Sequence, residues 1–151
     1  MNCRNTDIHS VLRDVVASYY GDFEQKKCVP YIVIPNPPAI IWGDPNALTR
    51  IFSNVVYNAL VHGEGNYQIT AAIEEAQTVI TIKMRRAVFS KKIFLICLTV
   101  FTPPTSHEQK RQPGWDWQSL KRLVTRMGGQ IVASLQNGIF AIQVVFPIVN
   151  S

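Results

Sequence analysis

The segment between Asp44 and Gly63 constrains the fold most strongly, because it encodes a long helix that must be buried over a broad face. Asp44-Pro45 begins the helix in the preferred way, with a capping side chain followed by proline at the first helical position. Apolar residues then recur at helical spacing up to His62. This apolar face comprises Leu48, Ile51, Phe52, Val55, Val56, Ala59 and Leu60. So broad a face predicts a helix that packs against another layer of structure.

Two further helices and six strand-like runs surround this segment. Apolar residues at helical spacing predict a first helix capped by Thr6 or Asp7, and a Gly-Gly pair ends the last one. An Asn-Gly pair at 137–138 is the strongest short signal for a β-hairpin. The predicted elements are helices over 7–25, 44–62 and 118–127, and strands over 29–34, 40–42, 67–73, 79–82, 131–135 and 139–146. This order predicts one mixed α/β domain, residues 1–151, with helices on a mostly antiparallel sheet.

Composition argues against several classes of protein. The longest apolar run, residues 93–101, is far shorter than the ~20 residues of a membrane-spanning helix. The N-terminal residues do not have the pattern of a signal peptide. The cysteines Cys3, Cys28 and Cys97 are far apart and fit no metal-binding spacing. We therefore expect a cytoplasmic chain without structural disulfides and without direct membrane insertion.

The net charge of +5 suggests nucleic-acid binding at first sight, but one segment supplies it. Residues 83–122 hold nine of the fifteen basic residues and only two of the ten acids, Glu108 and Asp116, so this segment carries +7. The remainder of the chain carries −2. A basic character confined to one segment argues against a nucleic-acid partner.

Asn54 and Asn58 are the residues that most suggest chemistry. They lie four residues apart, so they share one face of the long helix, and that face is otherwise apolar. A buried amide without a partner costs on the order of 1–3 kcal/mol. Two explanations are open: the amides cap neighbouring backbone, or an amide oxygen binds Mg²⁺, which takes hard oxygen ligands and bridges nucleotide phosphates.

This helix resembles the N box of the histidine kinase ATPase domain, whose fold is shared with gyrase and MutL. The resemblance lies in an Asp-x-x-x-Leu approach followed by Asn-x-x-x-Asn-Ala, within RIFSNVVYNALVHGEG at residues 50–65. It implies that Asn58 coordinates the magnesium ion on the nucleotide phosphates. It also implies that Asn54 and His62 lie near the nucleotide. Val61 departs from the pattern, because many members carry a phosphate-contacting lysine there.

The C-terminal part is similar to the same family. KRLVTRMGGQIVASLQNGIFAIQVVFPI, residues 121–148, matches its last helix, Gly-Gly stop and closing hairpin, so the resemblance covers 7–82 and 121–148. It implies a two-layer α/β sandwich with about three helices packed on the sheet. The nucleotide-binding residues that it implies are Asn54, Asn58, His62, Gly114 and Lys121.

The activity implied by the resemblance is that of a sensor histidine kinase in a two-component system. Such a domain binds ATP and Mg²⁺ and transfers the γ-phosphoryl group to a histidine on a separate dimerisation domain, upstream of a response regulator. His9, His62 and His107 lack the sequence context of that acceptor, so we expect it outside this chain. The parent kinase is either cytoplasmic or anchored in the inner membrane.

Residues 84–120 depart from the family pattern. The family has an adenine-side box here, then a Phe-rich box and a Gly-x-Gly lid whose backbone amides hold the phosphates. Gly114 alone stands where a lid glycine belongs, because Asp116 replaces the next one and Trp115 and Trp117 replace small aliphatic residues. A carboxylate near phosphate is unfavourable, so we expect the chain as written to bind ATP poorly.

A shifted reading frame explains this departure. Combining the last base of each codon with the first two of the next turns residues 115–118 into Gly-Leu-Ala, whichever synonymous codons are used. With permitted codons, residues 113–120 give the family's Gly-Leu-Gly-Leu lid and 97–108 give its Phe-rich box. We therefore hypothesise that Met84 to about Leu120 is an out-of-frame translation of an ordinary kinase gene. The alternatives are a genuine diverged lid, a degenerate kinase-like module that docks to a partner without ATP, and a basic nucleic-acid-binding domain.

The frame hypothesis predicts a specific result from resequencing the source DNA. We expect one additional A around the codons for Lys83-Met84 and one fewer around those for Leu120-Lys121, because both edges fall at lysine codons. The corrected chain should continue Ile-Lys-Asn-Ala-Pro after Thr81 and lose most of the +7 charge. DNA that confirms the present frame, with codons unable to encode the shifted boxes, would eliminate the hypothesis and favour the degenerate binding module.

Overall fold

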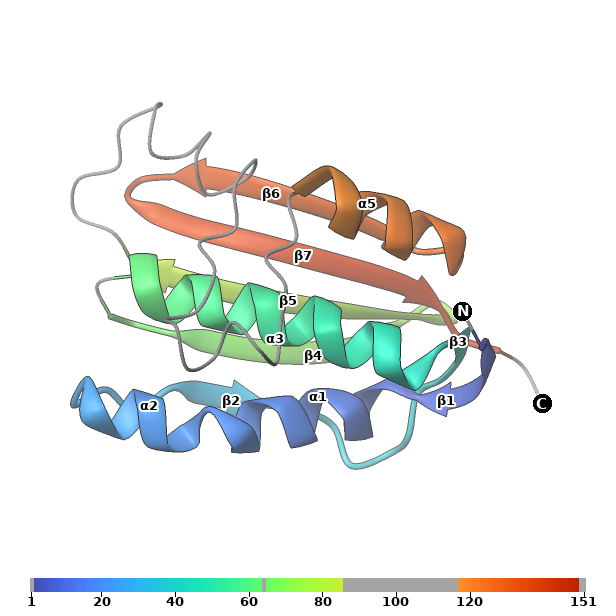
Figure 1. Ribbon diagram of the computed structural model, residues 1–151, viewed down its shortest axis with the longest axis horizontal. Helices are drawn as coiled ribbons and strands as arrows, with labels where there is room; N and C mark the ends of the chain where they lie inside the picture. The colour runs from blue at the N-terminus through green and yellow to red at the C-terminus, as the bar shows by residue number, and fades with distance from the viewer. Residues whose placement is uncertain (1, 64, 86–116, 150–151) are drawn as a thin grey trace.

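Two layers make up the protein, whose computed structural model describes residues 2–63, 65–85 and 117–149 (Figure 1). One layer is a five-stranded sheet in the order β2-β4-β5-β7-β6. β2 runs parallel to β4, and the other neighbours pair antiparallel. The strands are β2 (Tyr31–Val33), β4 (Gln68–Glu74), β5 (Gln77–Arg85), β6 (Gln130–Gln136) and β7 (Ile139–Pro147). The predicted mixed, mostly antiparallel sheet is confirmed.

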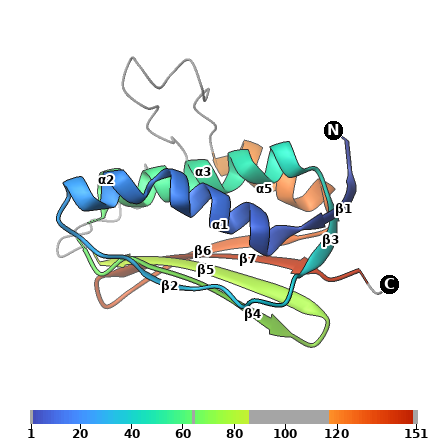
Figure 2. The same cartoon turned by 90° about the horizontal axis from the view of Figure 1, so that it is seen from below.

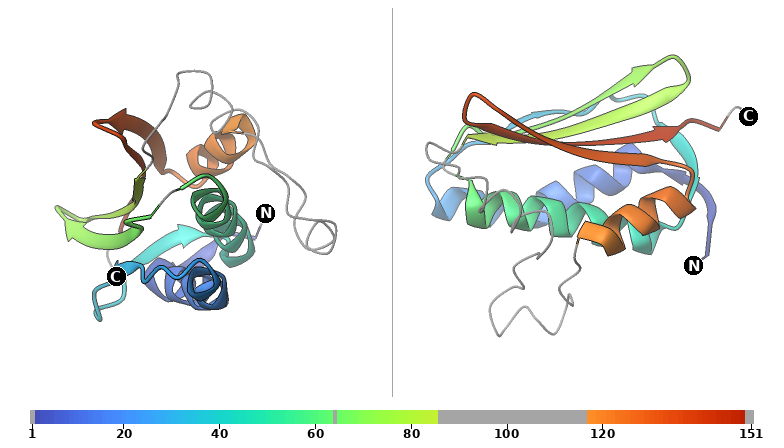
Figure 3. Two further views of the ribbon diagram at one scale, coloured as in Figure 1. Left: turned by 90° about the vertical axis from the view of Figure 1, so that its left-hand side faces the viewer. Right: turned by 90° about the horizontal axis from the view of Figure 1, so that it is seen from above.

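The second layer consists of helices that lie on one face of the sheet, as the edge view of Figure 2 shows. In the described part of the chain these are α1 (Ile8–Ser18), α2 (Tyr20–Gln25), α3 (Pro45–His62) and α5 (Trp117–Arg126). The long helix α3 lies between α1 and α5 (Figures 1 and 3). The two-layer α/β architecture is therefore confirmed, with α3 central in its helical layer.

The N-terminal region differs from the sequence prediction in two ways. The helix predicted over 7–25 is interrupted at Tyr19, whose ψ of 3° departs from helical geometry, so it becomes α1 and α2. Before it, β1 (Arg4–Asp7) pairs antiparallel with β3 (Ile40–Gly43) in a small second sheet. Four polar or charged residues gave no apolar alternation, so the pattern could not reveal β1.

Asp7 is the N-cap of α1, and Thr6 has a different role. The Asp7 carboxylate accepts hydrogen bonds from the backbone N–H of His9 at 3.1 Å and of Ser10 at 3.4 Å. The Thr6 hydroxyl donates to the carbonyl oxygen of Gly43 at 2.9 Å, across the β1–β3 pair. Of the two predicted caps, only Asp7 is confirmed, because the Thr6 hydroxyl bonds to Gly43 on β3 and the Asp7 carboxylate accepts from the first backbone N–H groups of the helix.

Both hairpins of the main sheet turn where the sequence predicted. The β4–β5 turn has positive φ at Glu75 (46°) and Ala76 (64°), and the β6–β7 turn has positive φ at Asn137 (52°) and Gly138 (76°). Two consecutive positive φ angles match the right-handed twist of the flanking strands. The hairpins fix the register of β4 against β5 and of β6 against β7.

The buried histidine His9 joins α1 to the sheet. Its Nδ1 lies 3.2 Å from the carbonyl oxygen of Pro37, and its Nε2 lies 2.9 Å from the hydroxyl oxygen of Thr78 on β5. Since a carbonyl oxygen only accepts, Nδ1 carries a proton, and in the neutral ring Nε2 accepts from the Thr78 hydroxyl. His9 therefore has a structural role.

The Gly-Gly stop of α5 leaves no room for a side chain at its second residue. Gly128 has a φ of +83°, and the N–H of Gly129 donates to the carbonyl of Val124 at 3.0 Å, which is a Schellman ending. A Cβ atom added at Gly129 would lie 2.6 Å from the ring of the fully buried Phe146. The helix end can pack this closely on β7 because Gly129 lacks a side chain.

Gly129→Ala should therefore destabilise the fold, by about 1–3 kcal/mol for an overpacked core site. The matched control is Gly21→Ala in α2, because an added Cβ atom there meets nothing within 4 Å. That control should leave stability unchanged or raise it by up to about 1 kcal/mol. Urea unfolding followed by circular dichroism measures both. Equal stabilities of the two variants would contradict the packing argument.

Candidate functional site

The N-terminus of α3 is held by the carboxylate of Asp44. One carboxylate oxygen accepts from the backbone N–H of Asn46 at 2.9 Å, which is an N-cap bond, and the other accepts from the N–H of Asn2 at 3.0 Å. Burial raises the pKa of Asp44, but backbone donors from Asn2, Asn46 and Ala47 outweigh it and hold the pKa below its ordinary value. The predicted Asp-Pro start of the helix is confirmed, and it also ties the N-terminal segment to α3.

Asn58 lies on α3 with its side chain only half satisfied. The residue is 5% exposed, and its Nδ2 donates to the backbone carbonyl of Asn54 at 3.0 Å. Since that carbonyl can only accept, the amide must place Nδ2 toward it and Oδ1 away from it. Oδ1 is buried and has no hydrogen-bond partner among the described residues. A buried acceptor in this state is a candidate ligand for a cation or a donor.

The structure agrees in part with both explanations of the asparagine pair, backbone capping and metal binding. The amide of Asn58 does bind neighbouring backbone through Nδ2, as the structural explanation requires. Its oxygen remains available, as the metal-ligand explanation requires. Asn54, 6% exposed, lies one turn earlier and contributes its backbone carbonyl to this arrangement.

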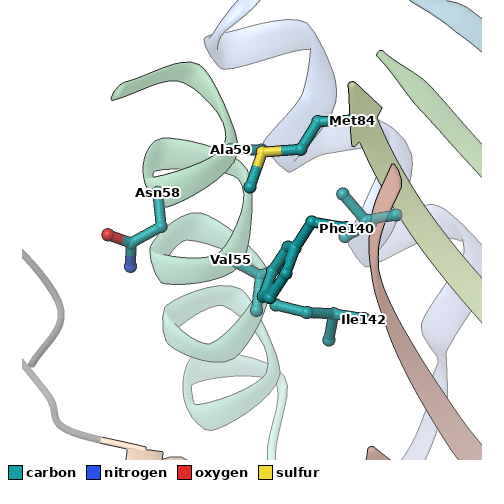
Figure 4. A pocket seen from close by; sticks show the side chains of 7 residues that line it. Val55, Asn58, Ala59, Met84, Phe140 and Ile142 are labelled. Carbon is teal, nitrogen blue, oxygen red and sulfur yellow. The ribbon is translucent and has the colours of Figure 1, made fainter. Parts of the chain in front are cut away.

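A pocket lies between α3 and the sheet, next to these asparagines (Figure 4). It is lined by Val55, Asn58, Ala59, Ile82, Met84, Phe140 and Ile142. Figure 4 shows Met84 and Phe140 grouped on the sheet side of α3, whereas the amide of Asn58 points away from them along another flank of the helix. Val55 and Ala59 form one stripe of α3, and Asn54 and Asn58 form the next, about 100° around the axis.

The structure gives less information on the other three predicted site residues, His62, Gly114 and Lys121. His62 is the last residue of α3, and Gly114 lies outside the described residues. Lys121 is exposed on α5, which lies on the same face of the sheet as α3 (Figure 1). The structure thus brings Asn54 and Asn58 together, and the roles of all five residues remain predictions.

Sequence reasoning missed the apolar lining of the pocket. Ile82, Phe140 and Ile142 looked like ordinary alternating strand residues. Met84 lay beyond the strand predicted over 79–82, whereas β5 continues to Arg85. Their register explains the pocket, because Ile82 is the cross-strand partner of Ile142, and Met84 is that of Phe140. The apolar alternation predicts which strand residues face the helices. Only the pairing of β5 with β7 shows that these residues line one pocket together with Asn58.

Comparison with known proteins gave matches among solved structures. No family model matches the sequence, and no curated protein does. The catalytic domain of histidine kinase ThkA has a TM-score of 0.77 and 14% identity, over 98% of this chain and 97% of that one. The Acinetobacter baumannii histidine kinase AdeS gives 0.74 and 14%, over 99% and 69%. Full-length ShkA in complex with AMPPNP gives 0.75 and 18%, over 100% and 32%.

The chain has the fold of a histidine kinase catalytic domain. The match covers nearly the whole of both chains, so it concerns the domain as a whole and not one motif of it. This confirms the fold expected from the sequence resemblance. With identities between 14% and 18%, the likeness establishes the fold, and the site must be argued from the residues themselves.

One described residue, Asn58, has the chemistry of a magnesium ligand. The free Oδ1 of Asn58 is a neutral, buried oxygen of the kind that Mg²⁺ accepts, and Mg²⁺ usually combines one or two protein oxygens with water and phosphate oxygens. Among the described residues, no group of three or more His, Cys, Asp or Glu side chains is close enough to hold a metal. In the same part of the chain, no helix is long and apolar enough to cross a membrane.

The lowered pKa of Asp44 predicts a pH-dependent contribution to stability. Because its pKa is lower in the folded than in the unfolded state, the ionised carboxylate stabilises the fold above about pH 4, and this contribution is lost as pH falls through the lowered value. Asp44→Ala should cost about 1 kcal/mol at pH 7, because the helix loses its cap.

Asp44→Asn is the matched control, since an amide can still cap the helix but carries no charge. Urea unfolding of wild type and Asp44→Asn should differ at pH 7 and converge as the pH falls below about 4. A difference that stays constant over this range would show that the charge of Asp44 is not what stabilises the helix start.

Proposed function

We propose that this chain derives from the ATP-binding catalytic domain of a sensor histidine kinase. The observation that carries the proposal is the buried Oδ1 of Asn58, which has no partner among the described residues and lies on the central helix of a histidine kinase fold. A buried acceptor without a partner is costly, so a bound group that completes it gives the arrangement a physical reason. The presence of AMPPNP, an ATP analogue, in the complex of ShkA supports the same ligand class.

The two flanks of α3 suit the two ends of a nucleotide. The stripe of Val55 and Ala59 faces an apolar pocket of the kind that takes a planar base, and the stripe of Asn54 and Asn58 offers oxygen toward phosphates and Mg²⁺. The nucleotide would then lie across the helix. Asn58 would hold the magnesium ion, whose contribution when bound is to neutralise charge on the phosphates.

The reaction of the parent kinase would be transfer of the γ-phosphoryl group to a histidine. This domain would position ATP, because phosphoryl transfer depends mainly on alignment and charge neutralisation. The acceptor would belong to the dimerisation domain of the same kinase, with a response regulator downstream and the domain in the cytoplasm. His9 is unsuited as acceptor, because both ring nitrogens are engaged in the core.

The chain as written would be impaired in this function. Residues 86–116, which should supply the lid, lie outside the described residues. The ends of the anomalous segment lie within regular structure: Met84 is a buried residue of β5, and Leu120 is a buried residue of α5. We retain the proposal that the segment is out of frame. The degenerate, non-ATP-binding interaction module remains the alternative.

Asn58→Ala tests the assignment in the chain with its frame restored. The substitution should abolish Mg²⁺-dependent binding of AMPPNP and leave the fold intact, because it removes a metal ligand and little core volume. Isothermal titration with and without Mg²⁺ measures the effect. The matched control is Asn46→Ala, which truncates an exposed asparagine of the same helix and should bind as before. Undiminished affinity in Asn58→Ala would contradict the assignment.

A further inference from the structure

The pocket between α3 and the sheet is nearly filled by its own side chains. The space open to the centre of a water molecule is about 10 Å³, which is room for roughly one water. A purine base is many times larger. Of the seven lining residues, six are apolar and Asn58 is the exception. The pocket therefore has the chemistry of a base site but lacks its size.

Met84 lines this pocket near the end of β5. It is the next-to-last residue of β5, and its cross-strand partner Phe140 is the second residue of β7. Ile82 and Ile142 form the next inward-facing pair along the same strands. Met84 and Phe140 therefore lie one residue from the ends of their strands, with the Arg85–Ile139 pair beyond them.

The Met84 side chain spans the gap between strand and helix. Figure 4 shows it reaching from β5 toward α3, with its sulfur beside Ala59. The sulfur is so near the end of α3 that a Cβ atom added at Gly63 would lie 2.9 Å from it. Met84 is only 3% exposed, so this position is packed on all sides.

We propose that Met84 closes the pocket and determines what it admits, an inference that rests on the proposed nucleotide-binding function. Methionine is unbranched and has three rotatable side-chain bonds, so it fills an irregular gap and can also be displaced. A base-sized ligand enters this chain only when the Met84 side chain leaves the gap. A short side chain at position 84 leaves an apolar, planar slot that takes a purine base.

The nature of the walls determines how such a base is held. Apolar lining from α3, β5 and β7 gives binding by burial and shape, with little contribution from charge. The affinity for an uncharged nucleoside should then change little with salt concentration. Phosphate contacts, in contrast, weaken as salt shields them. An uncharged nucleoside therefore probes the pocket independently of the lid and of Mg²⁺.

The test compares adenosine binding by isothermal titration in the full chain and in three variants. Met84→Ala and Met84→Asn should bind adenosine at least about tenfold more tightly than wild type, because the ligand no longer displaces a buried side chain. The matched control is Met127→Ala, since Met127 is also buried, at 5% exposed, but contacts the start of α3 near Asp44. Met127→Ala should bind adenosine as weakly as wild type.

Each outcome decides the role of Met84. If folded Met84→Ala binds adenosine no more tightly than wild type, Met84 does not close the pocket. An equal gain of adenosine affinity in Met127→Ala also overturns the role of Met84, because it would reflect a general loosening of the core. Urea unfolding establishes which variants are folded. If a Met84 variant does not fold, Met84→Val is tested in its place, because valine removes less core volume than alanine. Tight Mg²⁺–AMPPNP binding by wild type, unchanged in Met84→Ala, overturns the role of Met84 but leaves the proposed function standing. Adenosine binding gained by Met84→Ala supports the role of Met84, even where Asn58 proves irrelevant to Mg²⁺.

Discussion

The packing of α3 on β5 and β7 is the constraint on which the rest of the structure depends. The helix buries an apolar stripe against the inward-facing residues of both strands, and Asp44 fixes where it begins. Asn58 is buried on a neighbouring flank of the same helix, where an amide would ordinarily be fully bonded. The helix backbone supplies one partner, at Asn54, and no other described residue bonds to the amide oxygen. The candidate site therefore depends on the same helix as the core, because α3 carries both the stripe that packs on the sheet and the flank that holds Asn58.

Much of the fold was predictable because the local signals agree with the tertiary structure. The Asp-Pro start of α3, the Asn-Gly turn between β6 and β7 and the Gly-Gly end of α5 each have a backbone reason that neighbouring elements do not override. The interruption at Tyr19 and the strand β1 were missed because neither has such a signal. β1 forms by pairing with β3, residues that are distant in sequence, and its buried group is a single threonine hydroxyl. Pairing partners of this kind are set by topology, which periodicity does not contain.

The candidate site was predictable only in part, for a related reason. The spacing of Asn54 and Asn58 follows from helix geometry, so their shared face could be inferred from sequence alone. The orientation of the Asn58 amide depends on which neighbour accepts its hydrogen bond, and the sequence left that open. The apolar pocket depends on the register of β5 against β7, which brings Met84 opposite Phe140. Residues that line a pocket from two strands and a helix look like ordinary core residues until that register is known.

Position 84 connects two arguments that rest on different evidence. The shifted reading frame would place asparagine at position 84 of the corrected chain. In the present chain Met84 is one of the side chains that fill the pocket. A sequence that specifies a fold usually agrees with it except at functional sites. Met84 agrees with the fold, since it is buried and paired within β5, and it conflicts with a base in the pocket. A shifted frame that begins at Met84 explains this combination, because methionine packs well at the end of β5 and at the same time fills the pocket. A diverged but functional lid would instead require the same methionine to move aside at each binding event, at a cost to nucleotide affinity.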